Sequence, residues 1–399
     1  MMCKYNFYIL MVAMLGSITL SAQPRTDTLL QRLFSQGSPA LQHILQYPDS
    51  FRYQLIYTQI DRDAKNRPHF KHYYLHVDPD QYFNPASTVK MPIAFLALEK
   101  LNELHKQGLD KYTPMRIDSV EHDIAYYLKQ IFLVSDNDAY NRLYEFLGQQ
   151  TIHEKLWEKG YPRIRIVRRF MPLDEEGNRN TPAVSFGKIY TQPPARSALN
   201  FDFSKNIEIG RGHWDQHDSL IMTPMDFTKH NNVPLEDLQQ LLQSVIFPAS
   251  VPRKQRFHLT TNDYRFLYTY MSAYPSEVAN PHYDTATYFD SYVKFFLFKD
   301  KKQRPPSYIR IFNKPGWSYG FLTDVAYIID TKNKVEFMLS ATLYVNRDGI
   351  LNDDKYEYEE VGYPFFRETG EIIYQYELQR KRKYQPDLSP FKMTYEKGR

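Results

Sequence analysis

A serine and a lysine three residues apart are the residues in this sequence whose types and spacing most directly suggest chemistry. Ser87 and Lys90 follow an Asn-Pro turn at 84–85 and precede apolar residues over 93–104, which predicts that both lie on the first turn of a buried helix. A serine hydroxyl becomes a good nucleophile when a neighbouring base takes its proton, and a desolvated lysine can be that base. Unpaired N–H groups at the start of the helix would stabilise an oxyanion beside Ser87.

The same spacing also arises by chance on helix surfaces, so the pair needs support from other parts of the chain. A second copy, Ser291 and Lys294, lies in an aromatic run and has no turn before it. The first copy has support from two later polar clusters, which are described next.

The first of these clusters is Ser135-Asp136-Asn137, at the start of a segment that ends at Gly148. Serine and aspartate are good helix N-caps and glycine is a common helix stop, so the segment is predicted to be a helix. The triplet therefore has a purely structural explanation. It also supplies a second hydroxyl, which could pass a proton, and a carboxamide, which could hold a substrate amide.

The second cluster is Lys314-Pro315-Gly316, which follows a β-rich run at 308–313. Proline has no N–H to donate, so Pro315 indicates an edge strand. Such an edge could offer Lys314 to an anion and backbone groups to a peptide-like substrate, or it could simply end in a polar turn.

The elements that must position these residues can be predicted from periodicity. Alternating β-rich runs at 52–60 and 70–77 indicate a hairpin, and runs at 321–330 and 335–345 extend 308–313 into an antiparallel meander. Helices are predicted over 27–45, 234–245 and 260–271.

The three clusters, in this order and with their surroundings, resemble the three motifs of class A β-lactamases and penicillin-binding proteins. The resemblance extends over roughly 52–148 and 307–374. It implies an α+β, β-lactamase-like fold: an antiparallel sheet flanked by helices in an α-β-α sandwich, plus an all-helical lobe, with the site at their junction. The sheet lobe would comprise 27–80 and 307–378, and the helical lobe 81–306 with an enlarged middle region, 187–306.

The resemblance also implies a role for each matching residue. Ser87 would be the acylated nucleophile, Lys90 its base, and Ser135 the relay of a proton to the leaving nitrogen. Backbone N–H groups of Ser87 and Trp317 would form the oxyanion hole. Substrate-binding residues would be Asn137, Lys314, Gly316, Trp317 and Ser318.

Two departures from the family pattern bear on the reaction. Pro315 stands where the family has a hydroxyl that binds the substrate carboxylate, and Ser318 could replace it. The glutamate that activates the deacylating water in β-lactamases also has no clear counterpart, because local similarity puts Met171 at its position. Candidate replacements are Glu208 or one of the three acids Asp174, Glu175 and Glu176.

We therefore expect a secreted serine hydrolase that acts through an acyl-Ser87 intermediate on a β-lactam or related amide or peptide. The alternatives are a penicillin-binding, D-alanyl-D-alanine peptidase-like protein and a catalytically silent relative that binds cell-wall peptide. The resemblance implies no cofactor. We expect a monomer with a small-molecule β-lactam or peptidoglycan-like substrate.

The chain start and composition set further expectations. Residues 1–22 have a charged start, an apolar run and small residues at a cleavage site, which predicts a signal peptide and a bacterial periplasmic or secreted location without a membrane span after its removal. The only cysteine, Cys3, lies in this segment, so the mature chain would contain no thiol or disulfide.

Charge and local clusters favour no other class of partner. The formal net charge is +4 with both signs interspersed, so nucleic acid is not an expected partner. The His- and Asp-rich segment 213–218 could ligate a metal, but a solvated polar loop explains it better and no metal is expected. The basic tail, 379–399, is expected to be a solvated extension rather than a membrane-binding patch.

Overall fold

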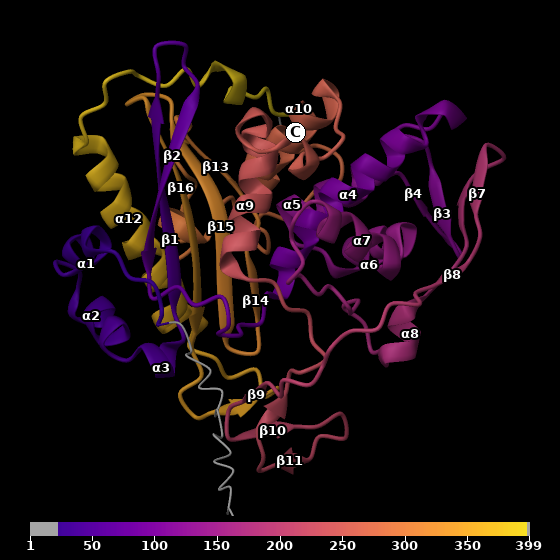
Figure 1. Cartoon of the computed structure of the whole chain (residues 1–399), viewed down its shortest axis with the longest axis horizontal. Helices are drawn as coiled ribbons and strands as arrows, with labels where there is room; N and C mark the ends of the chain where they lie inside the picture. Colours follow the sequence, from indigo (N-terminus) through magenta and orange to yellow (C-terminus); the bar gives the residue numbers. More distant parts are fainter. Residues whose placement is uncertain (1–22, 397–399) are drawn as a thin grey trace, which may run out of the picture.

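An antiparallel sheet forms the centre of the protein in a computed structural model, which describes residues 23–396 (Figure 1). The strand order is β13-β15-β16-β1-β2, and β14 pairs with β15 beyond the end of β13. The strands are β1 Gln54–Arg62, β2 Pro68–Leu75, β13 Ile309–Asn313, β14 Gly316–Ser318, β15 Phe321–Asp330 and β16 Val335–Tyr344. The predicted hairpin and meander are thereby confirmed, and β1 joins them by pairing Gln54 with Thr342.

Side chains on the two faces of this sheet belong to two hydrophobic clusters. Along β15, Val325 and Tyr327 point to one cluster while Ala326 and Ile328 point to the other. Successive side chains of a strand face opposite sides of a sheet, and both sides are buried here, so the strand is apolar on both faces. The structure confirms the predicted sandwich of helices around an antiparallel sheet.

One face of the sheet is covered by helices from both ends of the chain (Figure 1) and by the short segment α11 from the end of the middle region. These are α1 Thr28–Phe34, α2 Pro39–Gln46, α3 Pro48–Phe51, α11 Phe295–Phe298 and α12 Tyr363–Gln379. The single helix predicted over 27–45 is wrong, because the chain turns at 35–38 before α2. Ser38 caps α2 by accepting from the Leu41 N–H, and Pro39 occupies the first helical position, where its missing N–H costs nothing.

The other face packs against the larger hydrophobic cluster, which continues into the helical lobe. The helices on this side of the sheet and in the lobe are α4 Lys90–Glu103, α5 Ile124–Leu133, α6 Asn137–Leu147, α7 Gln149–Glu158, α8 Glu175–Arg179, α9 Leu235–Ile246 and α10 Thr261–Ser272. The predictions for α9 and α10 are confirmed within about a residue. However, α9 contacts β15 and β16, so this part of the middle region covers the sheet rather than extending the helical lobe.

The second lobe is not purely helical, because short strands connect and edge its helices. They are β3 Met115–Ile117, β4 Val120–His122, β5 Asn180–Thr181, β6 Val184–Phe186, β7 Tyr190–Gln192, β8 Ala195–Arg196, β9 Glu208–Ile209, β10 Gly212–Trp214, β11 Leu220–Ile221 and β12 Met225–Asp226. Strand β17, Ile350–Leu351, pairs in parallel with β10 and ties the middle region to the sheet lobe.

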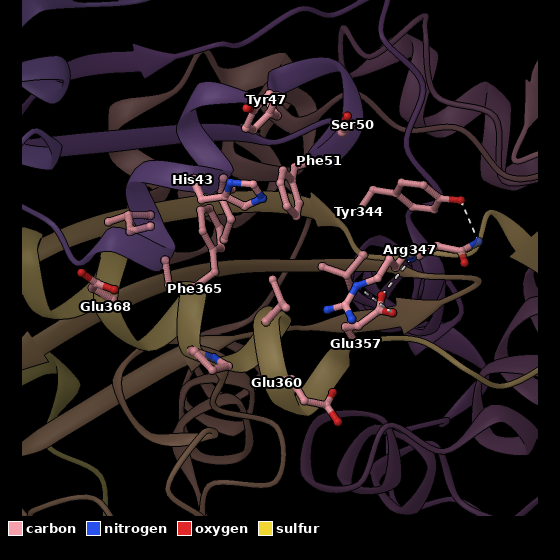
Figure 2. Close-up of a pocket in the computed structure, with 17 residues that line it drawn as sticks. His43, Tyr47, Ser50, Phe51, Tyr344, Arg347, Glu357, Glu360, Phe365 and Glu368 are labelled. Carbon is pink, nitrogen blue, oxygen red and sulfur yellow. Dashed lines mark hydrogen bonds and ion pairs between the residues drawn. The ribbon is translucent and has the colours of Figure 1, made fainter.

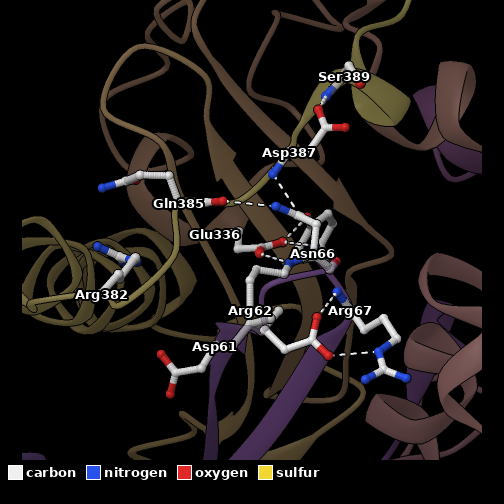
Figure 3. A network of polar contacts seen from close by, with 12 residues as sticks. Asp61, Arg62, Asn66, Arg67, Glu336, Arg382, Gln385, Asp387 and Ser389 are labelled. Atoms are coloured by element: carbon white, nitrogen blue, oxygen red, sulfur yellow. Dashed lines mark hydrogen bonds and ion pairs between the residues drawn. The ribbon is translucent and has the colours of Figure 1, made fainter.

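The C-terminal tail packs against the protein, which corrects the expectation of a solvated extension. Phe391 inserts its ring among aromatic side chains and is 5% exposed. Upstream, Asn66 in the β1–β2 turn donates to the Gln385 carbonyl at 3.0 Å and accepts from the Asp387 N–H at 2.9 Å (Figure 3). The basic residue Arg382 pairs with the buried carboxylate of Glu377. Apolar residues between the charges explain why the tail folds back.

Across residues 23–396, the structure contains no helix with the length and apolar character required to cross a membrane. The predicted signal peptide, residues 1–22, lies outside the described residues.

Candidate functional site

Ser87 lies on a tight turn that leads directly into α4. Residues Ala86–Val89 form a 3₁₀ turn, and the Lys90 N–H donates to the Ser87 carbonyl. Side chains three residues apart eclipse one another in a 3₁₀ helix, so the turn holds the hydroxyl and the amine on one side. Ala86 has a φ of 43°, a left-handed conformation that is unfavourable for a residue with a Cβ. Such strain concentrates at functional sites.

The amine of Lys90 is fully buried and makes three contacts with the loop before α6. It donates to the Ser135 carbonyl, to Asn137 Oδ1 at 2.7 Å and to Ser135 Oγ at 3.5 Å. Burial lowers the pKa of Lys90 to about 7, against the opposing attraction of Asp136 and Asp138. A substantial fraction of this amine is therefore neutral near pH 7 and able to accept a proton.

The hydroxyl of Ser135 accepts hydrogen bonds from both predicted lysines, Lys90 and Lys314. Lys314 Nζ donates to Ser135 Oγ at 2.8 Å and to the carbonyl of Pro315 at 2.8 Å. Ser135 itself has a φ of 60°, and Asp136 caps α6 by accepting from the Ala139 N–H. The lysine is fully buried, and desolvation together with the nearby charge of Lys90 holds the pKa of Lys314 well below its usual value. The structure thus brings together residues that are far apart in the sequence.

Gly316 allows β14 to approach the serine turn closely. A Cβ at Gly316 would lie 2.6 Å from Ser87 N and 2.9 Å from Pro85 O, so a side chain there would force the strand away. Trp317 and Ser318 continue β14 along the opening. The arrangement sets the backbone of β14 beside Ser87, as an oxyanion hole requires.

An open cleft of about 730 Å³ gives access to Ser87. One wall is formed by β14 and the turn after it, and the other by Asn137 and the loop 168–174. Gln216 and the segment 230–231 complete the lining, so residues of the enlarged middle region form part of the cleft. Lys90, Ser135 and Lys314 are buried directly behind this surface.

Phe170, rather than Met171, is the loop residue that faces Lys90. The Lys90 amine lies 5.2 Å from the centre of the Phe170 ring. Asn141, one helical turn after Asn137, fixes Phe170 by accepting from its N–H at 2.8 Å and donating to its carbonyl at 3.3 Å. Met171 is 40% exposed at the outer lip. An aromatic ring therefore fills the wall next to Lys90, while Met171, which local similarity puts at the glutamate position, is exposed along the cleft.

The acidic residues considered as a deacylating base lie elsewhere. Glu208 is exposed on β9, opposite Asp226 in the backbone register of β9 and β12. It does not line the cleft. Glu175 and Glu176 are exposed and form ion pairs, while Asp174 caps α8 by accepting from the Gly177 N–H at 2.7 Å. Within the described residues, Asp174 is the one carboxylate along the cleft. One of its two carboxylate oxygens, Oδ1, is already engaged in the cap of α8.

The second Ser-x-x-Lys copy has a structural role. Lys294 is fully buried and donates to the carbonyls of Met271 and Ile311 and to Asn313 Oδ1, at 2.7 to 3.0 Å. Asn313 in turn donates to Asp324, whose pKa is raised to about 7 by burial. This polar cluster lies in the sheet behind Lys314 and links β13 with β15.

A separate hollow of about 640 Å³ lies between α2–α3 and the start of α12 (Figure 2). It is lined by aromatic side chains such as Tyr47, Phe51 and Phe365, and Arg347 and Glu357 lie at its edge. It contains none of the predicted site residues. Over residues 23–396, no three His, Cys, Asp or Glu side chains are grouped so that they could hold a metal ion, and His213 instead contacts the Thr223 carbonyl.

The structure brings a serine and two lysines together at the junction of two lobes in a β-lactamase-like fold. Residues 41–193 match the model of a family described as the "Beta-lactamase enzyme family". The matched segment includes Ser87, Lys90, Ser135 and Asn137, and the match confirms the resemblance predicted from the motifs.

The chain is also similar to solved structures. A class A β-lactamase from Bacteroides cellulosilyticus is 11% identical with a TM-score of 0.47, covering 84% of this chain and 96% of that one. A β-lactamase from Xanthomonas campestris is 13% identical with a TM-score of 0.49, covering 88% and 99%. A variant of PBP-A, in an acyl-enzyme complex with penicillin G, is 13% identical with a TM-score of 0.49, covering 87% and 97%. No curated protein matches the sequence.

Proposed function

We propose that this protein is a serine acyl-enzyme hydrolase that reacts with a β-lactam or related amide and releases the acyl group slowly. The proposal rests above all on the convergence of Lys90 and Lys314 on Ser135, directly behind the cleft that exposes Ser87. Buried lysine pairs of this kind are costly to maintain, because each charge loses its hydration. The arrangement is therefore hard to explain as packing alone.

In the proposed reaction, Ser87 Oγ attacks the carbonyl carbon of the substrate while the neutral amine of Lys90 accepts its proton. The new oxyanion is stabilised by the N–H groups of Ser87 and Trp317. The C–N bond then breaks, and the nitrogen leaves with a proton passed from Lys90 through Ser135. Lys314 holds the Ser135 hydroxyl in position by donating to its oxygen. Asn137 is left to bind the substrate amide.

We expect slow release of the acyl group because of the residues in the loop 168–174, which forms the cleft wall opposite β14. Hydrolysis of an acyl-enzyme needs a base within hydrogen-bond reach of a water molecule. The loop presents the Phe170 ring beside Lys90, and Asp174 is used as a helix cap. This favours a penicillin-binding, peptidase-like behaviour over rapid β-lactam turnover.

A fluorescent penicillin tests the proposal. Wild type should acquire a covalent label that survives denaturing electrophoresis, and Ser87→Ala should acquire none. Ser291→Ala is the matched control, because it removes the other Ser-x-x-Lys hydroxyl, which is buried without a hydrogen-bond partner. It should be labelled like wild type. Unlabelled wild type from pH 6 to 9, or label on Ser87→Ala, would reject β-lactam acylation at this serine.

We also propose that the protein acts in the periplasm or outside a bacterial cell as a monomer, on a small β-lactam or peptidoglycan-like substrate. The apolar segment before Gln23 supports export. Mass spectrometry of protein from a periplasmic extract should find a mature N-terminus at Gln23, and an intact Met1 there would contradict cleavage.

A further inference from the structure

Two arginines, Arg168 and Arg169, line the cleft side by side in sequence but differ in their electrostatic partners. Arg169 is buried, and its guanidinium pairs with Glu145 at 2.6 Å and donates to the carbonyl of Asn180 at 3.0 Å. Its charge is neutralised within the protein. Arg168 is half-buried, and no carboxylate of the described residues lies within 4.0 Å of its guanidinium. Its charge is therefore available to the cleft.

Asp174, Glu175 and Asp226 line an adjoining hollow together with Arg168, and each has a partner of its own. Asp226 accepts from the Thr228 N–H at 2.7 Å. Glu175 pairs with Lys229 at 3.0 Å and with Arg179 at 3.2 Å. Asp174 is engaged by the Gly177 N–H. The positive charge of Arg168 is thus not balanced by a direct ion pair.

The main chain of Arg168 is held rigidly. Asn231 Oδ1 accepts from the Arg168 N–H at 2.9 Å, while Tyr140 OH donates to the Arg168 carbonyl at 2.7 Å. Asn231 Nδ2 donates to the same carbonyl at 3.3 Å. A fixed backbone reduces the entropy that the side chain loses when it binds a ligand.

The side chain of Arg168 is oriented by His230. A guanidinium N–H of Arg168 contacts His230 Nε2, and burial lowers the pKa of His230 to about 3. The imidazole is therefore neutral and can accept a hydrogen bond from Arg168 without adding charge. His230 also packs against Tyr319, with ring centres 6.1 Å apart, which connects this wall to the turn after β14.

On the opposite wall, neither Pro315 nor the Lys314 amine is free to bind an anion. Pro315 offers no hydroxyl, and both of the observed donations by the Lys314 amine go to the protein itself, to Ser135 and the Pro315 carbonyl. Ser135 and Lys314 would serve the leaving nitrogen, so the acyl part of the substrate must extend along the rest of the cleft. That part of the cleft contains Arg168.

We infer that Arg168 is a specificity-determining residue, which binds a carboxylate on the acyl side of the substrate while His230 positions it. Arginine suits this task because its planar donors match the two oxygens of a carboxylate. The inference deepens the proposed function by naming the substrate class: acyl donors that carry an additional negative charge.

Two penicillins that differ by one carboxylate test the inference. We expect α-carboxybenzylpenicillin to acylate wild type at least about tenfold faster, in second-order rate constant, than benzylpenicillin does, since a bidentate ion pair is worth that factor. In Arg168→Gln the ratio should fall close to one. Arg116→Gln, an exposed arginine on β3 that is paired with Glu121, is the matched control and should retain the wild-type ratio.

A second experiment measures binding without acylation, so that it tests the role of Arg168 even if no penicillin reacts with the protein. Phenylmalonate and phenylacetate, the corresponding side-chain acids, can be titrated by calorimetry into the Ser87→Ala variant with Arg168 present or replaced by glutamine. Phenylmalonate should bind more tightly only when Arg168 is present. Equal binding of the two acids, or a preference that survives Arg168→Gln, overturns the role of Arg168. If no penicillin acylates wild type, the proposed function fails, and this titration still decides the inference.

Discussion

Among single residues, Lys90 links burial to chemistry most directly. Its amine is removed from solvent and its pKa lies near 7. Below that pH the amine carries a proton and cannot accept another, whereas above it the neutral form predominates.

The rate of acylation by penicillin should therefore rise about tenfold per pH unit up to pH 7 and level off above it. Stopped-flow labelling over pH 5 to 9 measures this profile. Asp138→Asn removes a negative charge that raises the pKa of Lys90, so the midpoint should move to lower pH. A flat profile would show that Lys90 is not the base.

Phe170 gives a second prediction at this scale. Phe170→Glu would put a carboxylate where the ring now faces Lys90, and a positioned general base typically contributes 10²-fold or more. The acyl-enzyme half-life, followed by loss of label after excess penicillin is removed, should shorten by at least about tenfold.

Met171→Glu is the matched control, because it adds the same charge one residue further along the loop at the exposed lip. Its half-life should stay close to that of wild type. If Met171→Glu shortened the half-life and Phe170→Glu did not, Met171 rather than Phe170 would be the residue that reaches the acyl group.

The conformation of the loop 168–174 illustrates the limit of the sequence for the site. The helix start at Asp136 and the strand before Lys314 follow from capping and alternation, so the positions of Ser135, Asn137 and Lys314 could be predicted. The loop 168–174 has no periodicity, and its register depends on hydrogen bonds from Asn141, which is distant in sequence. The side chain of Asn141 lies one helical turn from Asn137, and this spacing was the available signal.

At the scale of elements, the contact between β14 and the serine turn is the most demanding feature. Gly316→Ala should lower the acylation rate at least about a hundredfold, the cost of losing one oxyanion donor, because the added Cβ would meet Ser87 N at 2.6 Å and displace the strand. Circular dichroism should report an unchanged fold.

Gly187→Ala provides the comparison, since a Cβ at Gly187 meets nothing within 4 Å. It should acylate like wild type, with at most a small loss of stability because φ is +58°. Normal acylation by Gly316→Ala would mean that β14 does not form the oxyanion hole.

The elements themselves were predictable to different degrees. Long strands such as β15 and β16 and the helices α9 and α10 are strongly patterned, and they were located within about a residue. The break between α1 and α2 was missed because the apolar spacing continues across 35–38, although Gly37 and Pro39 mark it. The short strands β3 to β12 were not predicted, since two or three residues give no measurable period.

For the whole molecule, the packing of the C-terminal tail is the feature that could not be predicted from the sequence. Phe391 packs within 5.0 to 5.9 Å, between ring centres, of Phe247, Tyr268, Phe312 and Tyr327. Charged residues dominate the composition of this segment, and that composition favours a solvated extension over a packed one.

Phe391→Ala should lower the free energy of unfolding by about 3 kcal/mol, the usual cost of removing a buried phenyl ring. Urea denaturation followed by fluorescence measures the change. Lys392→Ala, at the exposed neighbouring position, should change it by less than about 0.5 kcal/mol. Equal values for the two variants would mean that the tail contributes nothing to the core.

The position of β1 has a consequence for biosynthesis. This strand is made early but lies inside the sheet, between β2 and β16, with Gln54 paired to Thr342. While the polypeptide is emerging from the ribosome, β1 has only its hairpin partner, and its other edge stays open until residue 344 is available. Most of the chain must therefore be synthesised before the sheet can form completely. Chaperones that shield unpaired strands should increase the yield of this protein more than they increase the yield of proteins whose strands pair locally.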